Sequence, residues 1–129
     1  MQLLAYILIY PILWFISILP FRLLYAVSDM LYVLMYHVIG YRKKAVYENL
    51  KLVFPEKSEM ELLTITKKFY HHLCDMIVES IKSMTISIDS MKARYKFNNL
   101  DIITDFEKQN KSIILMCAHY GSWEWIFIL

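Results

Sequence analysis

The sequence predicts an α/β fold in which a membrane-associated amino-terminal helix or helices precede the start of a mixed sheet flanked by helices. One observation is the scarcity of charge at the amino terminus, where only two charged residues precede Arg42. Another is the short apolar run from Ile113 to Cys117, which is typical of a strand buried on both faces. The third is a long stretch of helical periodicity between residues 59 and 84. We therefore expect a membrane-anchoring or interfacial segment over residues 1–40 and a globular body over residues 41–129.

The first apolar run, Leu3 to Leu19, is uncharged and 17 residues long, which is the lower limit for a helix that spans a bilayer. Tyr6, Tyr10 and Trp14 recur every four residues and suit a stripe at the membrane interface. Pro20 is expected to end the helix. A buried core helix is the alternative, but a chain of 129 residues offers little protein to bury it. No basic residue precedes the run and no small-residue cleavage site follows it, which argues against a cleavable signal peptide.

A second apolar stretch, Phe21 to Ile39, either completes a hairpin across the membrane or lies in the interface plane. We favour the interface plane, because Asp29 would be costly in the middle of a bilayer. The basic residues Arg42, Lys43 and Lys44 follow and are the candidate membrane-surface residues, since each could attract anionic headgroups. By the positive-inside rule, they place the body on the cytoplasmic side. An ordinary solvated helix start is the alternative interpretation of these three residues.

The body begins with two predicted helices. One runs from Arg42 to Phe54 and is closed by Pro55, and the next begins near Glu59 behind a capping box at Ser58 and Glu61. The second helix should cover the sheet with an apolar stripe made of Leu62, Ile65, Phe69, Leu73, Met76, Ile77, Ser80, Ile81 and Met84.

A βαβ unit is predicted to follow these helices. Ala93 to Phe97 is a candidate strand, Leu100 to Gln109 is a short helix after the cap signal Asn98-Asn99, and Ile113 to Cys117 is the central strand. A strand, a helix and a second strand suggest a right-handed crossover in a parallel or mixed sheet.

Composition argues against several classes of function. The formal net charge of +2 is too small and too mixed to suggest nucleic-acid binding. Only two glycines are present, so the chain has no glycine-rich nucleotide loop, and we expect no cofactor. His71 and His72 are adjacent and would point apart on a helix, so we expect no metal site there. His71 and Asp75 have the spacing of a surface pair.

His119 and Glu124 are the candidate catalytic residues. His119 would sit in the turn between the central strand and a helix that begins at Trp123 with Ser122 as its cap, at the carboxyl end of a strand where α/β sheets bind ligands. A histidine can take a proton from an alcohol near neutral pH, and a carboxylate on its other ring nitrogen fixes its tautomer. The alternative is a hydrogen-bonded histidine in a turn and a surface glutamate.

Neighbouring groups extend this site. The backbone N–H groups of Gly121, Ser122 and Trp123 could bind an oxyanion or a phosphate, and these three are the candidate substrate-binding residues. Cys117 lies two residues before His119, so a Cys-His acyl-enzyme is an alternative. Its position at the end of a buried strand favours plain packing. In a cytoplasmic body, Cys74 and Cys117 should be reduced thiols.

Two motifs resemble those of the bacterial lipid A late acyltransferase family. The segment Ala118-His119-Tyr120-Gly121-Ser122-Trp123-Glu124 is similar to the family's His-x4-Glu motif, with Ser122 where asparagine is usual. Upstream, Tyr41-Arg42, Asn49-Leu50 and Phe54-Pro55-Glu56 resemble its Arg, Asn-Leu and Phe-Pro-Glu signature. Together with the apolar amino terminus, the resemblance covers essentially the whole chain.

This resemblance implies an O-acyltransferase of the bacterial inner membrane, with its catalytic body on the cytoplasmic side. Residues 41–129 would be the amino-terminal part of an α/β acyltransferase domain, truncated at the carboxyl end. The implied donor is an acyl carrier protein thioester or acyl-CoA, and the implied acceptor is a hydroxyl of a lipid A precursor. His119 would be the general base and Glu124 would orient it. The alternatives are a lysophospholipid or glycerolipid acyltransferase that uses acyl-CoA, and a non-catalytic membrane-anchored fragment.

Overall fold

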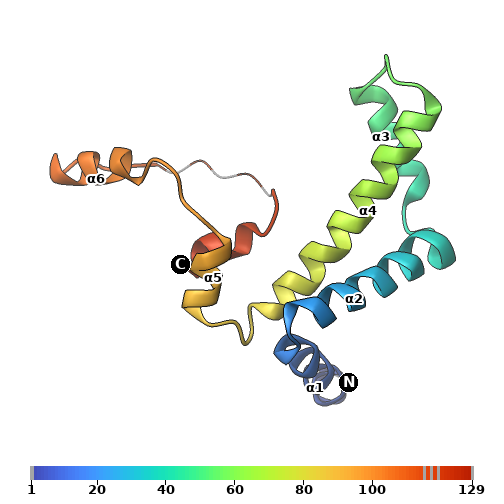
Figure 1. Cartoon of the computed structure of the whole chain (residues 1–129), viewed down its shortest axis with the longest axis horizontal. Helices are drawn as coiled ribbons and strands as arrows, with labels where there is room; N and C mark the ends of the chain where they lie inside the picture. The colour runs from blue at the N-terminus through green and yellow to red at the C-terminus, as the bar shows by residue number, and fades with distance from the viewer. Residues whose placement is uncertain (1, 115, 117, 119, 129) are drawn as a thin grey trace. The chain divides into compact units, whose positions relative to one another are not determined.

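The computed structural model describes residues 2–114, 116, 118 and 120–128, and these residues form helices and loops without a strand. Figure 1 shows the helices in chain order. Two compact units divide the chain, Met1–Thr85 and Ile86–Leu129. The elements are α1 (Gln2–Ile18), α2 (Phe21–Tyr32), the π-helix η1 (Val33–Ile39), α3 (Lys43–Val53), α4 (Glu59–Lys82), α5 (Ile88–Arg94), α6 (Leu100–Lys108) and the 3-10 helix η2 (Trp123–Phe127).

The first unit is built around α4, which packs against α1, α2, η1 and α3. Its hydrogen bonds join the start of α2 to the end of α4, so the two helices run antiparallel. On both sides of this contact the buried side chains recur every fourth residue, which is the ridge spacing of packed helices. They are Leu24, Ser28, Tyr32 and Tyr36 on α2 and η1, and Leu62, Thr66, Tyr70, Cys74, Val78 and Lys82 on α4.

The core of this unit consists of Tyr32, Tyr36, Tyr70 and Cys74. The rings of Tyr32 and Tyr36 stack with their centroids 5.5 Å apart, and the Cys74 Sγ lies 3.9 Å from the Sδ of Met35. Burial raises the pKa of the Cys74 thiol above its ordinary value. Cys74 is a free, buried thiol that packs within this core.

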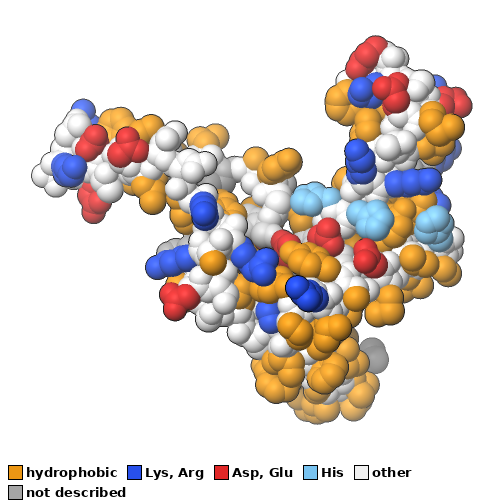
Figure 2. Space-filling view, viewed as in Figure 1, with side chains coloured by type: hydrophobic (Ala, Val, Ile, Leu, Met, Phe, Trp, Pro, Cys, Tyr) orange, Lys and Arg blue, Asp and Glu red, His pale blue; other side chains and the backbone are white. Residues whose placement is uncertain are grey.

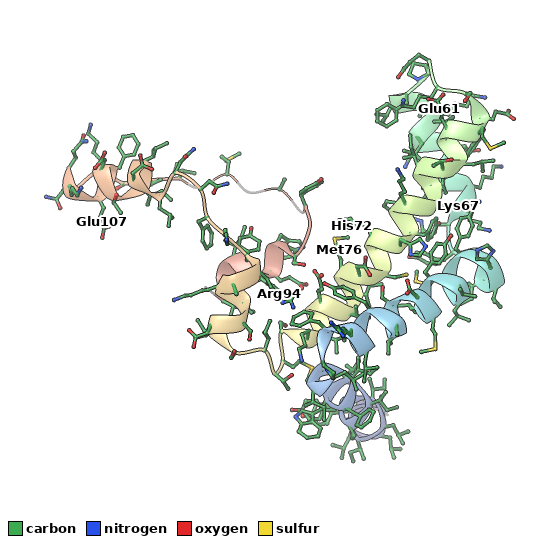
Figure 3. All side chains as sticks on the ribbon, in the orientation of Figure 1. Glu61, Lys67, His72, Met76, Arg94 and Glu107 are labelled. Atoms are coloured by element: carbon green, nitrogen blue, oxygen red, sulfur yellow. The ribbon has the colours of Figure 1, made fainter. Side chains whose placement is uncertain are left out.

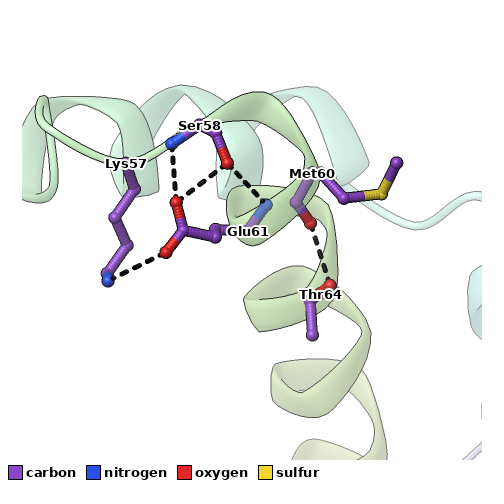
Figure 4. A network of polar contacts seen from close by, with 5 residues as sticks. All are labelled: Lys57, Ser58, Met60, Glu61 and Thr64. Atoms are coloured by element: carbon purple, nitrogen blue, oxygen red, sulfur yellow. Dashed lines mark hydrogen bonds and ion pairs between the residues drawn. The ribbon is translucent and has the colours of Figure 1, made fainter.

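The predicted capping box at the start of α4 is confirmed (Figure 4). The Ser58 N–H and hydroxyl donate to the Glu61 carboxylate at 2.9 and 2.8 Å, and the Ser58 hydroxyl accepts from the Glu61 N–H at 3.4 Å. Because the Ser58 backbone N–H binds the charged carboxylate, the pKa of Glu61 is lowered. The predicted helices over residues 42–54 and 100–109 are also present, as α3 and α6.

The predicted apolar stripe of α4 is only partly confirmed. Leu62 is buried, Leu73 packs half-buried against the core, and most of the other predicted positions are half-buried. The buried positions from Thr66 to Lys82 lie one residue out of phase with most of the predicted ones, and Phe69 and Met84 are exposed. The cause is the chemistry of the partner helix: α2 presents tyrosine and serine, so α4 meets it with hydroxyl-bearing and polar side chains as well as apolar ones. Lys67 and His72, both labelled on α4 in Figure 3, are exposed.

The predicted mixed sheet is wrong for the described residues. In place of the first strand, Ala93 and Arg94 end α5, and residues 95–98 form a loop. The cause lies just upstream, where the Ser87 side chain caps α5 by accepting from the Ser90 N–H at 3.3 Å. Residues 113, 114 and 116 of the predicted central strand have no regular structure. Without a neighbouring strand in the described chain, an apolar run has no ladder to join.

Candidate functional site

The candidate site lies in the second unit, on the segment that follows α6. Ile114 and Met116 are exposed, and the Tyr120 N–H donates to the Ala118 carbonyl at 2.9 Å. Gly121 then adopts a φ of +59°, a left-handed conformation that favours glycine. Open space surrounds the position where a Cβ would lie, so backbone conformation, and not crowding, explains the glycine. The segment thus reverses sharply before η2.

Glu124 lies in the first turn of η2, next to Trp123, and both side chains are half-buried. The predicted helix start at Trp123 is confirmed in position, but the helix is of the tighter 3-10 kind. Ser122 occupies the N-cap position without a capping hydrogen bond from its side chain, so its predicted capping role is wrong. Its backbone carbonyl instead accepts from the Trp125 N–H at 3.0 Å, as a short 3-10 turn requires.

His119 and Cys117 lie outside the described residues. The contact between His119 and Glu124, the proton acceptor role of His119 and the packing role of Cys117 therefore stay predictions. Among the described residues, the structure brings Gly121, Ser122, Trp123 and Glu124 together as one half-buried stretch.

Trp125 is a residue of this segment that the sequence motifs did not single out. Its side chain is only 4% exposed, and its indole Nε1 has no hydrogen-bond partner among the described residues. Its place directly after Glu124, in the apolar run that ends the chain, is the sequence signal that could have identified it.

The three candidate membrane-surface residues lie together at the start of α3 in the first unit. Arg42 is the N-cap residue, with a φ of +49°. The Lys43 Nζ lies 3.9 Å from the centre of the Tyr36 ring, and the Lys44 Nζ lies 3.9 Å from the Glu48 carboxylate. The prediction that these cations contact headgroups stays a prediction.

A polar seam between α2 and α4 was missed in the sequence, from which Asp75 was expected only as one half of a surface pair with His71. The Ser28 hydroxyl donates to Asp75 at 2.6 Å, and the Tyr25 hydroxyl donates to Glu79 at 2.7 Å. The predicted pairing of His71 with Asp75 is therefore wrong. His71 instead stacks on Tyr32 at 3.6 Å, and its Nδ1 lies 3.7 Å from the Asp29 carboxylate.

Lys82, at the end of α4, is the second feature missed. Its side chain is 9% exposed, and its Nζ donates to the carbonyls of Ser17 and Leu19 at 2.7 and 2.8 Å. Thr85 adds a third bond to the Ser17 carbonyl at 2.6 Å. These donors satisfy the carbonyls at the end of α1, which no helical N–H can reach. The sequence signal that could have identified Lys82 is the recurrence of small and polar residues at every fourth position along α4.

The outer surfaces of α1 and α2 are apolar. Figure 2 shows hydrophobic side chains covering α1, and large exposed side chains run along this helix from Leu3 to Ile18. Phe21–Ile39 is the stretch of the described chain that is long and apolar enough to cross a bilayer by length and composition, with a mean hydropathy of 1.2, and Leu3–Ile18 is a shorter apolar helix.

Comparison with known proteins now identifies the family. The model of the bacterial lipid A biosynthesis acyltransferase family matches residues 2–129. The comparisons with curated proteins and with solved structures returned no match for this chain. Membership of such a family implies acyl transfer, which needs an acyl donor and a lipid acceptor. The resemblance that the His119 and Arg42 motifs predict is thereby confirmed, and the chain belongs to the bacterial lipid A biosynthesis acyltransferase family.

Proposed function

We propose that this chain is part of a membrane-associated O-acyltransferase that moves a fatty acyl chain from acyl carrier protein to a hydroxyl of a lipid A precursor. The observation that carries the proposal is the family match, which extends over residues 2–129 and so includes the whole segment from His119 to Glu124. The sharp turn at Gly121 and the half-buried position of Glu124 directly after it support a role for this segment in binding and chemistry.

In the proposed mechanism, the His119 imidazole removes the proton of the acceptor hydroxyl as its oxygen attacks the thioester carbonyl carbon. Glu124 holds the imidazole in the required tautomer and stabilises the imidazolium. The carbonyl oxygen becomes an oxyanion, for which the backbone N–H groups of Gly121, Ser122 and Trp123 are the candidate donors. When the carbonyl re-forms, the carbon–sulfur bond breaks and the leaving thiolate takes the proton from His119. The products are an ester and a free thiol.

We further propose that α1 embeds in the membrane and that α2 with η1 lies along its surface. The buried face of α2 packs on α4, which carries Asp75 and Glu79 opposite Ser28 and Tyr25. A helix with these carboxylates is too costly for the bilayer centre, so the α2–α4 pair favours the interface. α2 and η1 also carry exposed large apolar side chains, which this placement would turn toward the lipid, namely Leu23, Met30, Val33, Leu34, Val38 and Ile39. On this model the body faces the cytoplasm, because Arg42, Lys43 and Lys44 follow the apolar part.

An activity assay with two donors tests the proposed reaction. The full-length protein is supplied with a lipid A precursor and with either an acyl carrier protein thioester or the matching acyl-CoA. We expect transfer from the carrier protein thioester to be faster, and His119→Ala to remove nearly all transfer from both donors. Preference for acyl-CoA, or for a glycerolipid acceptor, would contradict the proposed substrates. Normal turnover by a folded His119→Ala protein would contradict the proposed base.

A further inference from the structure

A cavity of about 330 Å³ opens between the start of α3 and the middle of α4, entirely within the first unit. Its size is at the lower end of the range for small-molecule sites. Eight residues line the cavity: the apolar Ala45, Val46, Phe69 and Leu73, the tyrosines Tyr41 and Tyr70, and, at the α3 side, the polar Arg42 and Asn49. One charged group on an apolar wall suits an amphipathic ligand with an anionic end.

The three neighbouring cationic side chains, Arg42, Lys43 and Lys44, differ in the partners that they already have. Lys43 lies over the Tyr36 ring, and Lys44 is close to Glu48. The Arg42 side chain lines the cavity. Within the described residues, no carboxylate forms an ion pair with it. Its planar guanidinium could bind a phosphate through two parallel hydrogen bonds, which a lysine ammonium cannot do.

The backbone that carries Arg42 is held in place before any ligand binds. Gly40 and Arg42 both have left-handed φ angles, +66° and +49°. The Tyr70 hydroxyl, on a fully buried ring, donates to the Tyr41 carbonyl, and the Tyr41 N–H donates to the Met35 carbonyl at 3.0 Å. These bonds fix the turn and therefore the origin of the Arg42 side chain. A preorganised cation loses less freedom when it binds an anion.

We propose that this cavity binds the phosphate-bearing end of an anionic bilayer phospholipid. Arg42 would bind the phosphate, Asn49 would bind a headgroup hydroxyl, and the apolar wall would contact the first carbons of an acyl chain. The occupant is inferred from position: Arg42 comes three residues after Ile39, and Val38 and Ile39 are 71% and 62% exposed. If this apolar face contacts lipid, the cavity mouth lies in the headgroup layer. This step rests on the proposed membrane association, and not on the proposed chemistry.

Lipid binding to the purified full-length protein tests the proposal without any turnover. The protein is kept in a neutral detergent and titrated with phosphatidylglycerol or phosphatidylcholine, and native mass spectrometry counts the bound lipids. We expect one phosphatidylglycerol to bind in preference to phosphatidylcholine. Arg42→Gln should weaken phosphatidylglycerol binding about tenfold, in line with the loss of charge-assisted bonds. The matched control Lys44→Gln should change it less than twofold.

A second variant tests the cavity itself. Val46→Trp should fill the space and weaken phosphatidylglycerol binding, while the circular dichroism spectrum shows unchanged helical content. Full binding by this folded variant would overturn the assignment to the cavity. Equal losses in Arg42→Gln and Lys44→Gln would also overturn it, because they would indicate diffuse charge attraction.

Two further measurements identify the source of the phosphate that the cavity binds. Displacement of the lipid by millimolar inorganic phosphate would overturn a lipid-specific site, and we expect no displacement. A tenfold higher KM for the lipid A precursor in Arg42→Gln, with unchanged phosphatidylglycerol binding, would reassign the site to the acceptor and overturn the proposal. Loss of acyl transfer in His119→Ala leaves this binding measurement untouched, so the two proposals fail separately.

Discussion

Lys82 shows how one side chain can join an apolar helix to a polar one. Its aliphatic stem is buried at the end of α4, and its ammonium binds two carbonyls at the carboxyl end of α1, where the helix dipole favours a cation. The Nζ also lies 5.6 Å from the centre of the Phe21 ring. Desolvation lowers the pKa of Lys82 below its ordinary value of 10.5.

Replacing this lysine should loosen α1 from α4. We expect Lys82→Met to lower the free energy of unfolding by about 2 kcal/mol, because hydrogen bonds from a charged donor are lost and buried carbonyls are left without a partner. Lys68→Met, on the exposed side of the same helix, is the control and should have little effect. Thermal unfolding in detergent measures both. Equal stability of the two variants would mean that the Lys82 bonds contribute nothing.

The pH dependence of stability gives an independent check. The Lys82 pKa is lower in the folded chain than in the unfolded chain, so just below pH 10.5 the unfolded state binds more protons. Lys82 therefore makes the free energy of unfolding rise as the pH rises through this window. Lys82→Met should remove that rise and Lys68→Met should keep it. A rise of the same size in both variants would contradict the buried position of this ammonium.

At the scale of elements, the sequence correctly predicted the helices and caps that depend on interactions between residues close together in the sequence. The capping box at Ser58 and Glu61 fixed the start of α4, and the periodicity before Pro55 fixed α3. The predictions that failed concern elements whose structure depends on residues far away in the sequence. The apolar run from Ile113 forms no strand in its described residues, since β-pairing needs a second strand, and the expected one is divided between the end of α5 and a loop. A cap at Ser87 with Asp89 in the first turn was the available warning.

The face of α4 was mispredicted for a related reason. Hydrophobicity alone placed Phe69 in the buried stripe and left Tyr70 out of it. The partner surface on α2 and η1 is aromatic and hydroxyl-rich, and Tyr70 is the fully buried residue. The candidate catalytic motif was recognisable because its residues are close in sequence. The Arg42 cavity was not, because Phe69 and Leu73 reach it only through the packing of α4 on α3.

The capping box should control the amino-terminal end of α4. Ser58→Ala should destabilise the helix start by about 1 kcal/mol, the usual loss for a capping serine. Because the folded pKa of Glu61 is lowered, its contribution is present above the ordinary carboxyl pKa of 4.5 and is lost as the pH falls through the folded value. Amide hydrogen exchange at residues 59–63 measures the effect. Glu59→Gln, which leaves the box intact, is the control and should keep the acid sensitivity that Glu61→Gln removes.

At the scale of the whole chain, charge and apolar surface are separated along the sequence. The exposed apolar side chains of α1 lie ahead of all the charged residues of the sequence, and the family motifs come after them. This order fits an enzyme whose acceptor and product are both lipids, because an anchored body needs to search only the membrane surface.

Membrane attachment should therefore depend on the apolar surface of α1. We expect the protein to stay in the membrane pellet after washing with high salt and with alkaline carbonate. Leu8→Glu combined with Ile12→Glu should release it into the carbonate supernatant, because charge on the exposed face of α1 opposes burial in lipid. Leu52→Glu, on an exposed position of α3, is the control and should stay attached. Release of the unaltered protein by high salt alone would contradict the anchor.

The central claim is that His119 and Glu124 act as one catalytic unit. A double-mutant cycle on kcat/KM tests it most directly, with the full-length protein, a lipid A precursor and an acyl carrier protein thioester. His119→Ala should lower the rate on the order of a hundred- to ten-thousandfold, the range for a lost general base. Glu124→Gln should also be severe, since an amide can present the wrong partner to the imidazole. We predict that the double variant is little worse than His119→Ala alone, because residues that act together are strongly non-additive. If the two single losses multiply in the double variant, the residues act independently and the proposed dyad is wrong.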